Sequence, residues 1–246
     1  MPQYLVFRLY APLASWGEIA VGEVRRSAFH PSKSAIIGLL SAAIGIDRHD
    51  ETQLKQMVEG YILGVKVLSQ GILMQDYQTI DAPPENKKRN YKTRKEELSV
   101  NKDDRSTLQS WRQYLCDSLY VIAIRCHENA PFSLERLKEA LKEPVFHLYL
   151  GRKSYPLAHP LQPQIVEGSL RQALDSNLPR DQLESKSLIE LLTVDKSLAH
   201  YFWEPTDNSD DLQETIRTER PDVPINRRAW YFKQRKECRG VAKENK

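Results

Sequence analysis

The stretch Tyr4-Leu5-Val6-Phe7-Arg8-Leu9-Tyr10 alternates between two sets of side chains, and Pro31-Ser32-Lys33-Ser34 follows it after a loop. The alternation predicts a half-buried strand over residues 4–10, because successive side chains of a strand point to opposite faces. Apolar residues then recur at helical spacing from Ile36 to Ile44. A serine can cap this helix and Gly45 ends it, so the chain begins with a strand and then a helix.

The rest of the first 150 residues repeats strands and helices. Asp50 and Gln53 form a capping box for a second helix, whose apolar stripe ends at Tyr61, and Ser133 caps a third helix. Strands are predicted at 63–68, 72–77, 119–126 and 145–150, with the tight turn Ser69-Gln70-Gly71 joining the first two. This order gives the βαββαβ pattern of the α+β ferredoxin-like fold, which RNA-recognition modules also use.

A long basic segment interrupts this pattern. From Ile80 to about Asp104 nothing is periodic, and Lys87-Lys88-Arg89-Asn90-Tyr91-Lys92-Thr93-Arg94-Lys95 contains no acid. A packed core cannot hold so many unpaired charges, because each would lose its hydration. The segment is therefore solvated, or it lies against an anion such as a nucleic-acid strand; from this run alone the two readings are equal. We expect an irregular or mobile excursion, an inserted hairpin or loop, over about residues 78–110.

The composition describes an ordinary soluble protein. Of 246 residues 40% are hydrophobic and 28% charged, and the net charge of +3 hides separate basic and acidic segments. Cys116, Cys126 and Cys238 indicate neither a disulfide framework nor a zinc site. The N-terminus lacks a signal pattern and the apolar run 36–46 is too short to cross a bilayer, so we expect a cytoplasmic protein without membrane contact.

The last hundred residues differ from the first 150. They are rich in proline and polar residues, with an acidic stretch from about Leu170 to Glu214 and a basic tail after Tyr231. We interpret residues 1–150 as one domain and 151–246 as a smaller β-rich lobe with an acidic helical excursion. The tail is expected to be a solvated appendage or a contact with nucleic acid.

Several cations lie beside aromatic or glycine residues in a way that favours RNA. Arg112 lies between Trp111 and Tyr114, where its guanidinium can bracket a phosphate or stack on a base. Tyr149 precedes Gly151-Arg152-Lys153-Ser154, where a ring can stack on a base beside backbone N–H groups that face phosphate. A snorkelling surface arginine and a core tyrosine are the structural alternatives.

The start of the first helix is a second candidate. Arg25 and Arg26 precede it, and Lys33 and Ser34 lie at its N-terminus, which attracts anions. An ordinary helix cap explains Ser34 almost as well. His30, His147 and His159 have no partner at metal-ligand spacing, so no metal or cofactor is expected. His30 with Tyr10 or Lys33 can be drawn as an RNA-cleaving pair, but we favour structural roles for these histidines.

Separated motifs in the chain resemble those of one family. They are residues 7–17, 29–40, 43–46, 76–79, 111–117 and 149–161, with a weaker match at Arg228-Ala229-Trp230-Tyr231. Together they resemble the CasD family, the RAMP-type subunit of the CRISPR surveillance complex Cascade (type I-E). The resemblance is nearly continuous to about Leu161 and patchy after it.

The resemblance implies a non-catalytic RNA-binding subunit. Such a subunit holds the 5′ handle of the crRNA, caps one end of the backbone filament and carries a protruding thumb. The implied partners are the crRNA, the backbone, large and other Cascade subunits and, through the complex, target DNA. The RNA-binding residues that we expect are Arg25, Arg26, Lys33, Ser34, Lys87, Lys88, Arg89, Tyr91, Lys92, Arg94, Arg112, Tyr149, Arg152 and Lys153.

Two other functions compete with this expectation. One is a metal-independent endoribonuclease of related fold that processes CRISPR repeat RNA. The other is a generic RNA-recognition module, which is disfavoured because neither RNA-binding strand carries the Gly-aromatic signature of that module.

Overall fold

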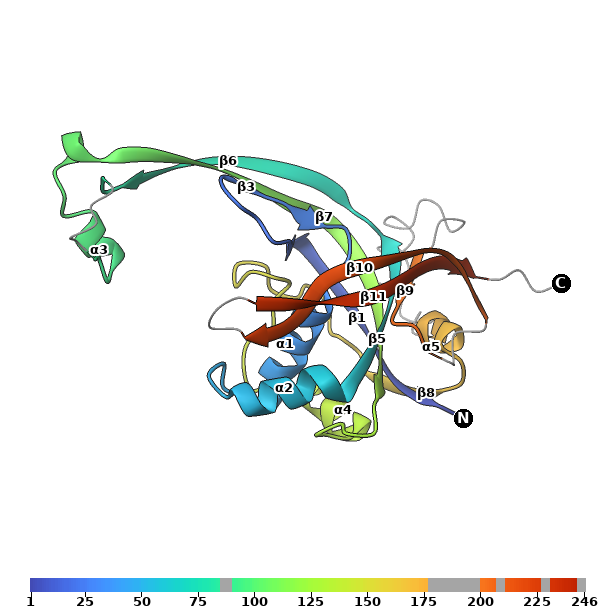
Figure 1. Cartoon of the computed structure of the whole chain (residues 1–246). Helices are drawn as coiled ribbons and strands as arrows, with labels where there is room; N and C mark the ends of the chain where they lie inside the picture. Colours follow the sequence, from blue (N-terminus) through green and yellow to red (C-terminus); the bar gives the residue numbers. More distant parts are fainter. Residues whose placement is uncertain (85–89, 177–199, 207–210, 227–230, 243–246) are drawn as a thin grey trace.

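A large antiparallel sheet organises the molecule, with helices on both of its faces (Figure 1). This computed structural model describes residues 1–84, 90–176, 200–206, 211–226 and 231–242. Along its main path the nine-stranded sheet has the order β10-β11-β9-β5-β7-β1-β8, and β3 and β6 also pair with β7. The architecture is thus mixed α/β, as the sequence predicts, with few helices and one dominant sheet.

The elements have the following bounds. The strands are β1 (Gln3–Ala14), β2 (Trp16–Gly17), β3 (Val24–Arg25), β4 (Ser27–Ala28), β5 (Tyr61–Ser69), β6 (Ile72–Ala82), β7 (Ser106–Cys126), β8 (Gln164–Glu167), β9 (His200–Trp203), β10 (Leu212–Asn226) and β11 (Tyr231–Ala242). The helices are α1 (Lys33–Ile44), α2 (Glu51–Gly60), α3 (Arg94–Glu97), the 3-10 turn η1 (Lys102–Asp104), α4 (Leu134–Lys142) and α5 (Leu170–Ser176).

The two faces of β1 belong to two apolar clusters, which explains why the strand is more buried than its alternation predicts. Leu5, Phe7 and Leu9 pack with α1, α2 and α4, and Tyr4 and Val6 pack with α5 and the C-terminal strands. Burying one such large apolar side chain contributes about 1.5–3 kcal/mol. The sheet is therefore a central layer between two sets of elements.

The helix boundaries follow the predicted capping signals. Ser32 caps α1 by accepting from the backbone N–H of Ala35, and Asp50 caps α2 in the same way. Gly45 ends α1 with φ of 92°, a conformation that glycine adopts without strain. Tyr61 is an exception to the predicted helix stripe, because it is the first residue of β5.

The region expected to be an inserted hairpin or loop is largely a β-hairpin. β6 pairs with β7 from Ile72↔Cys116 to Ala82↔Ser106, and we call these two segments the arm. Figure 1 shows the arm reaching away from the body, with α3 at its far end. Its 11-residue strand spans about 37 Å. Within the segment from Ile80 to about Asp104 that was expected to lack regular structure, β6 continues to Ala82 and α3 spans Arg94–Glu97, so the prediction was wrong for these residues.

The turn Ser69-Gln70-Gly71 does not fold β5 and β6 into a hairpin. β5 pairs with residues 119–126 of β7 and β6 with residues 106–116, so the two follow one another along the same edge of β7. Gly71 has φ of 70°, and a Cβ there would lie 2.2 Å from the Cys116 carbonyl oxygen. The glycine thus lets the chain pass close to β7 instead of reversing.

The strand predicted at 145–150 is also absent from this region. The only pairing recorded there is the isolated bridge between Tyr149 and Pro156. Val145 and Phe146 instead donate to carbonyls at the end of α1, which fixes this segment against the helix. The strand next to β1 is β8, later in the chain, and it gives the order β5-β7-β1-β8.

The C-terminal segment continues the sheet of the first 150 residues. β9 pairs with β5, and β11 lies between β9 and β10. The expected boundary at residue 150 therefore does not coincide with a break in the sheet. The basic tail expected after Tyr231 is strand β11, so a solvated appendage is the wrong description of residues 231–242. Most of the acidic excursion lies outside the described residues.

Candidate nucleic-acid interface

The register of the arm divides its side chains between two faces. Arg112 lies opposite Asp76 and Trp111 lies opposite Tyr77, and neighbouring residues of a strand point to opposite sides. We call the two surfaces the Arg112 face and the Trp111 face. Short strand β3 pairs in parallel with the root of the arm and extends both faces, with Arg25 beside Arg112 and Val24 beside Trp111.

The Arg112 face carries a cluster of cations at the root of the arm. Arg112 Nε donates to Ser110 Oγ at 3.2 Å, and Arg25 donates to the Ala20 carbonyl. Arg152 contacts Tyr114, two residues after Arg112, and its Nη1 donates to the phenol oxygen of Tyr114 at 3.2 Å. We call Arg25, Arg112 and Arg152 the arm-root cluster. None of the three forms an ion pair with a carboxylate of the described chain, so the cluster offers its charge to an external anion.

A tight turn presents Arg152 to the arm. Gly151 has φ of 86°, and a Cβ there would lie 1.8 Å from the Ser15 carbonyl oxygen, so only glycine fits. Next to this turn, Tyr149 is 36% exposed and Lys153 is exposed. Tyr155 packs edge-on against Tyr114, and burial and this contact raise the pKa of its phenol. Tyr114 therefore joins the segment 149–153 to the strand that carries Arg112.

The Trp111 face lines a cleft of about 910 Å³. Its other wall is formed by the loop before α1 and by the C-terminal strands, which contribute Phe29, Arg220 and Arg239. Arg26 projects into this cleft, whereas its neighbour Arg25 belongs to the Arg112 face. The cations that the sequence groups before the first helix are therefore divided between two surfaces.

The tip of the arm holds the remaining predicted basic residues. Arg94 pairs with Glu97 and donates to the Asp81 carbonyl, and the Lys92 backbone N–H donates to Glu96. Tyr91 is partly exposed. The predicted residues Lys87, Lys88 and Arg89 lie outside the described residues. The tip thus balances part of its positive charge with its own acids.

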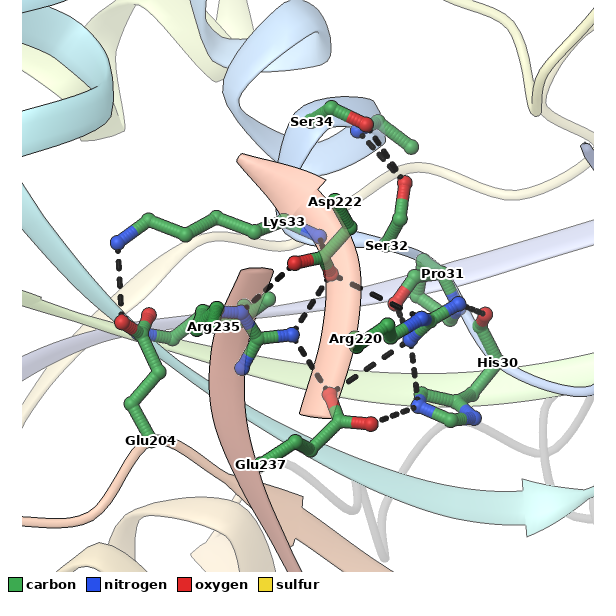
Figure 2. Close-up of polar contacts among 12 residues, drawn as sticks. His30, Pro31, Ser32, Lys33, Ser34, Glu204, Arg220, Asp222, Arg235 and Glu237 are labelled. Atoms are coloured by element: carbon green, nitrogen blue, oxygen red, sulfur yellow. Dashed lines mark hydrogen bonds and ion pairs between the residues drawn. The ribbon is translucent and has the colours of Figure 1, made fainter. Parts of the chain in front are cut away.

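The predicted anion site at the start of α1 is occupied by the protein itself (Figure 2). Asp222 Oδ2 accepts the Lys33 backbone N–H at 2.9 Å, and Lys33 Nζ lies 3.0 Å from Glu204. The Lys33 side chain is buried in this pair, so it does not form part of an RNA-binding surface. Ser34 is half-buried, and its hydroxyl lies 2.9 Å from that of the capping residue Ser32. These contacts leave no room for a phosphate where the sequence favoured one.

His30 belongs to the same buried network. Its Nε2 lies 3.0 Å from Glu237 Oε2 and 2.6 Å from Arg220 Nη1 (Figure 2). Its ring stacks on that of Phe202, with 3.8 Å between the ring centroids. Burial lowers the pKa of His30, and the nearby Arg220 lowers it further against the opposing effect of Glu237. His30 is thus held by Glu237, Arg220 and Phe202, and the Lys33 side chain is held by Glu204, so the proposed pairing of His30 with Lys33 has no geometric support.

Arg235 lies at the centre of this network. It donates two bonds to Asp222 on the facing strand β10 and one to Glu237, two residues further along β11. Burial opposes the charge of Arg235, but these bonds outweigh it and raise the pKa of the guanidinium. For Glu237, burial raises the pKa, whereas the hydrogen bond from His30 and the nearby arginines lower it to about 2. The network therefore fastens the C-terminal strands to α1.

The described residues contain no group of His, Cys, Asp or Glu side chains placed to hold a metal ion. Among the helices described, none is both long and apolar enough to span a membrane.

The sequence missed the residues that organise both faces of the arm. Tyr114 and Gln75 were not among the predicted site residues, and neither were Phe29 and Arg239 of the cleft. The alternation Ser110, Arg112, Tyr114 against Trp111, Gln113, Leu115 was a signal for two faces. This alternation did not enter the strand prediction, because the predicted strand 119–126 begins only after these residues.

Comparison with known proteins first defines the class of fold. A solved structure described as a CRISPR RNA-guided surveillance complex matches with a TM-score of 0.63 and 21% identity, covering 97% of this chain and 91% of that one. A second, described as a crystal structure of a Cas protein, has a TM-score of 0.56 and 23% identity over 97% and 95%. At this identity the likeness shows the fold.

The family follows from the sequence itself. The family model described as CRISPR-associated protein (Cas_Cas5) matches residues 4–237, so the chain belongs to this family. The CRISPR system Cascade subunit CasD of Escherichia coli (strain K12) is 31% identical over 174 residues, which are 65% of this chain and 70% of that protein. The resemblance to the CasD family that the motifs indicated is confirmed.

Proposed function

We propose that this protein is a non-catalytic RNA-binding subunit of a CRISPR surveillance complex of the Cascade type. It holds the 5′ handle of the crRNA, caps one end of the backbone filament, and has the backbone, large and other Cascade subunits as partners. Its contact with target DNA is indirect, through the complex, and its setting is the cytoplasm. The likeness to a named Cascade subunit supports the proposal, and so does the fold shared with a chain of a surveillance complex.

The architecture proposed for this role is a ferredoxin-like core with a thumb. The order β5-β7-β1-β8, with α1 and α2 between β1 and β5 and α4 between β7 and β8, supports the core. The arm supports the thumb, because it is a long hairpin that leaves the body of the molecule (Figure 1). Such a hairpin can contact a neighbouring subunit or a distant part of an RNA without disturbing the sheet.

The observation that carries the function is the arm-root cluster. Cations from β3, β7 and the turn after Gly151 come from distant parts of the sequence and share one face with Tyr114. Arginine guanidinium groups without carboxylate partners bind phosphate well, and exposed aromatic rings stack on unpaired bases. We assign the RNA backbone to this face, with Tyr149 and Lys153 at its border. Arg26 belongs to the cleft, and the tip of the arm forms a separate contact.

Incubation of the purified protein with a labelled repeat-derived RNA in EDTA tests both parts of the proposal. We expect the RNA to be retained with a strong dependence on salt and to remain intact. Retention without salt dependence would contradict the binding mode, and a cut at one site would favour the endoribonuclease.

A further inference from the structure

The cleft on the Trp111 face has the composition of a base-binding site. Its volume of about 910 Å³ lies within the range of about 300–1,000 Å³ that small-molecule and cofactor sites have. Phe29 is 50% exposed at its edge, and Trp111 is half-buried in its wall. Arg26 and Arg239 provide positive charge at the same cleft. Aromatic rings beside arginines are the combination that holds unpaired bases in single-stranded RNA.

Two glutamine side chains give this cleft the means to distinguish one base from another. Gln75 and Gln113 lie opposite each other across the arm, and both line the cleft. Gln113 is engaged, because its Oε1 accepts the Ser27 backbone N–H and its Nε2 points at Gln75 Oε1 at 3.4 Å. Within the described part of the chain, Gln75 Nε2 donates to no protein group, and its Oε1 keeps a second lone pair.

We propose that this cleft binds one unpaired adenine of the RNA whose backbone lies on the arm-root cluster, and that Gln75 reads it. A glutamine amide complements adenine in two bonds, because Nε2 donates to a ring nitrogen while Oε1 accepts from the 6-amino group. The base stacks on the half-exposed ring of Phe29, and Arg26 and Arg239 face the adjoining phosphates. The inference rests on the proposed function and adds a specific base site to it.

Other features of the cleft agree with a neutral base and not with a phosphate at its centre. Glu18 and Glu219 also line it, and carboxylates disfavour a concentrated negative charge. Arg220 is already held by the His30 and Pro31 carbonyls and lies near Asp222 and Glu237. Only Arg26 and Arg239 therefore remain for phosphate among the arginines that line the cleft.

The test uses the full chain and a set of repeat-derived RNAs in which each adenine in turn is replaced by unsubstituted purine. Purine keeps the ring and its stacking but lacks the 6-amino group. At one position we expect the affinity of the wild-type protein to fall about tenfold, from the loss of one of the two bonds. In Gln75→Leu, adenine and purine at that position should bind alike.

Two further variants make the result specific. Gln109→Leu changes an exposed glutamine farther out on the same face, beyond the cleft, and should keep the preference for adenine. Phe29→Ala removes a half-exposed ring and should weaken every RNA with a base at that position, but not an RNA with an abasic nucleotide there. Circular dichroism melting of each variant confirms that the fold is retained.

Two outcomes would overturn the inference. Equal binding of all the purine-substituted RNAs by the wild type, with salt-dependent binding intact, would exclude the adenine site and leave the RNA-binding function standing. A preference for adenine that survives in Gln75→Leu would exclude Gln75 as its reader. If the wild-type protein retained no RNA, the proposed function and the adenine site would both fail.

Discussion

The guanidinium of Arg152 lies over the ring of Tyr114, 5.0 Å from its centroid, and its Nη1 is 3.2 Å from the phenol oxygen. The contact joins the turn after Gly151 to β7 at the root of the arm. It therefore holds a cation beside Arg112 on one face and ties the orientation of the arm to the body of the protein.

From this contact we predict that Arg112→Ala combined with Arg152→Ala weakens RNA binding through the loss of phosphate contacts. The affinity for a repeat-derived RNA should fall at least tenfold, because hydrogen bonds to charged groups contribute about 1.5–3 kcal/mol each. The slope of log affinity against log salt should become shallower by about 1.4 if both contacts are lost from a single strand. Fluorescence anisotropy between low and high salt measures both quantities.

Arg136→Ala is the matched control, because Arg136 is an exposed arginine on α4, away from the arm. Its salt slope and affinity should equal those of the wild type. An unchanged slope in the double variant would remove Arg112 and Arg152 from the binding surface.

We predict that the tip of the arm serves binding and not stability. Residues 83–105 can be replaced by Asn-Gly, because Ala82 and Ser106 pair directly and a two-residue turn closes such a hairpin. The melting temperature should stay within about 2 °C of the wild type, a shift that corresponds to less than about 1 kcal/mol in a chain of this size. RNA retention in the assembled complex should decrease.

A second variant separates charge from shape at the tip. Lys92→Ala with Arg94→Ala keeps the hairpin and removes two exposed cations. If RNA retention falls as far as in the shortened protein, the tip acts through charge. Full retention in both variants would show that the tip is dispensable for RNA.

Arg235 and Lys236 are neighbours on β11 with opposite environments, and they give a sharp test of the buried network. Arg235→Leu leaves Asp222 and Glu237 without their main partner and should cost about 3–5 kcal/mol of unfolding free energy. Lys236→Ala changes an exposed side chain and should stay within about 0.5 kcal/mol. Chemical denaturation measures both. Equal stability of the two variants would mean that the network does not hold the C-terminal strands in place.

His30 gives this network a predictable dependence on pH. The pKa of His30 is lowered in the folded protein, so below the unfolded value of 6.5 the unfolded chain binds more protons than the folded one. The free energy of unfolding should therefore decrease as the pH falls from 7 to 5. The carboxylate of Glu237 has the depressed pKa of about 2, so its stabilising contribution is complete above its ordinary value of 4.5 and is lost as the pH falls towards 2.

His30→Gln should flatten the decrease between pH 7 and 5, and urea denaturation at a series of pH values measures it. His49→Gln, which changes an exposed ring before α2, controls for the loss of a histidine. A His30→Gln curve parallel to that of the wild type would show that another group causes the decrease.

The sequence predicted local structure where one physical signal was sufficient. Asp50 and Ser133 cap their helices as expected, and the serine that caps α1 is Ser32, since a side-chain oxygen satisfies free backbone N–H groups whatever the rest of the fold. The family could also be recognised from the sequence, because several separate motifs occur in the expected order. The pairing of the strands could not be predicted from the sequence. The segment Ser69-Gln70-Gly71 could either reverse the chain into a hairpin or let it continue along one edge. The outcome depends on pairing with β7, which lies about forty residues later in the sequence.

The charged residues of the candidate site also depend on contacts that the sequence alone does not reveal. Lys33 looks like a phosphate ligand at a helix start, but Asp222 and Glu204, far along the sequence, occupy both of its donors. Arg25 and Arg26 are adjacent in sequence, but Arg25 pairs with Arg112 at the end of β3, whereas Arg26, just after this strand, lines the cleft. Arg112 was predicted from its aromatic neighbours in sequence, and in the fold it forms no ion pair with a carboxylate of the described chain. Carboxylates from distant parts of the sequence therefore determine which cations remain available to bind an external anion.

The most direct test of the account is the RNA that co-purifies with this chain when it is expressed together with its partner subunits. The account predicts short guide-sized RNA with one common 5′ sequence for the wild type, and a strong loss of that RNA when Arg25, Arg112 and Arg152 are changed together to alanine. Random cellular RNA with the wild type, or the same guide RNA in undiminished amount with the triple variant, would contradict it.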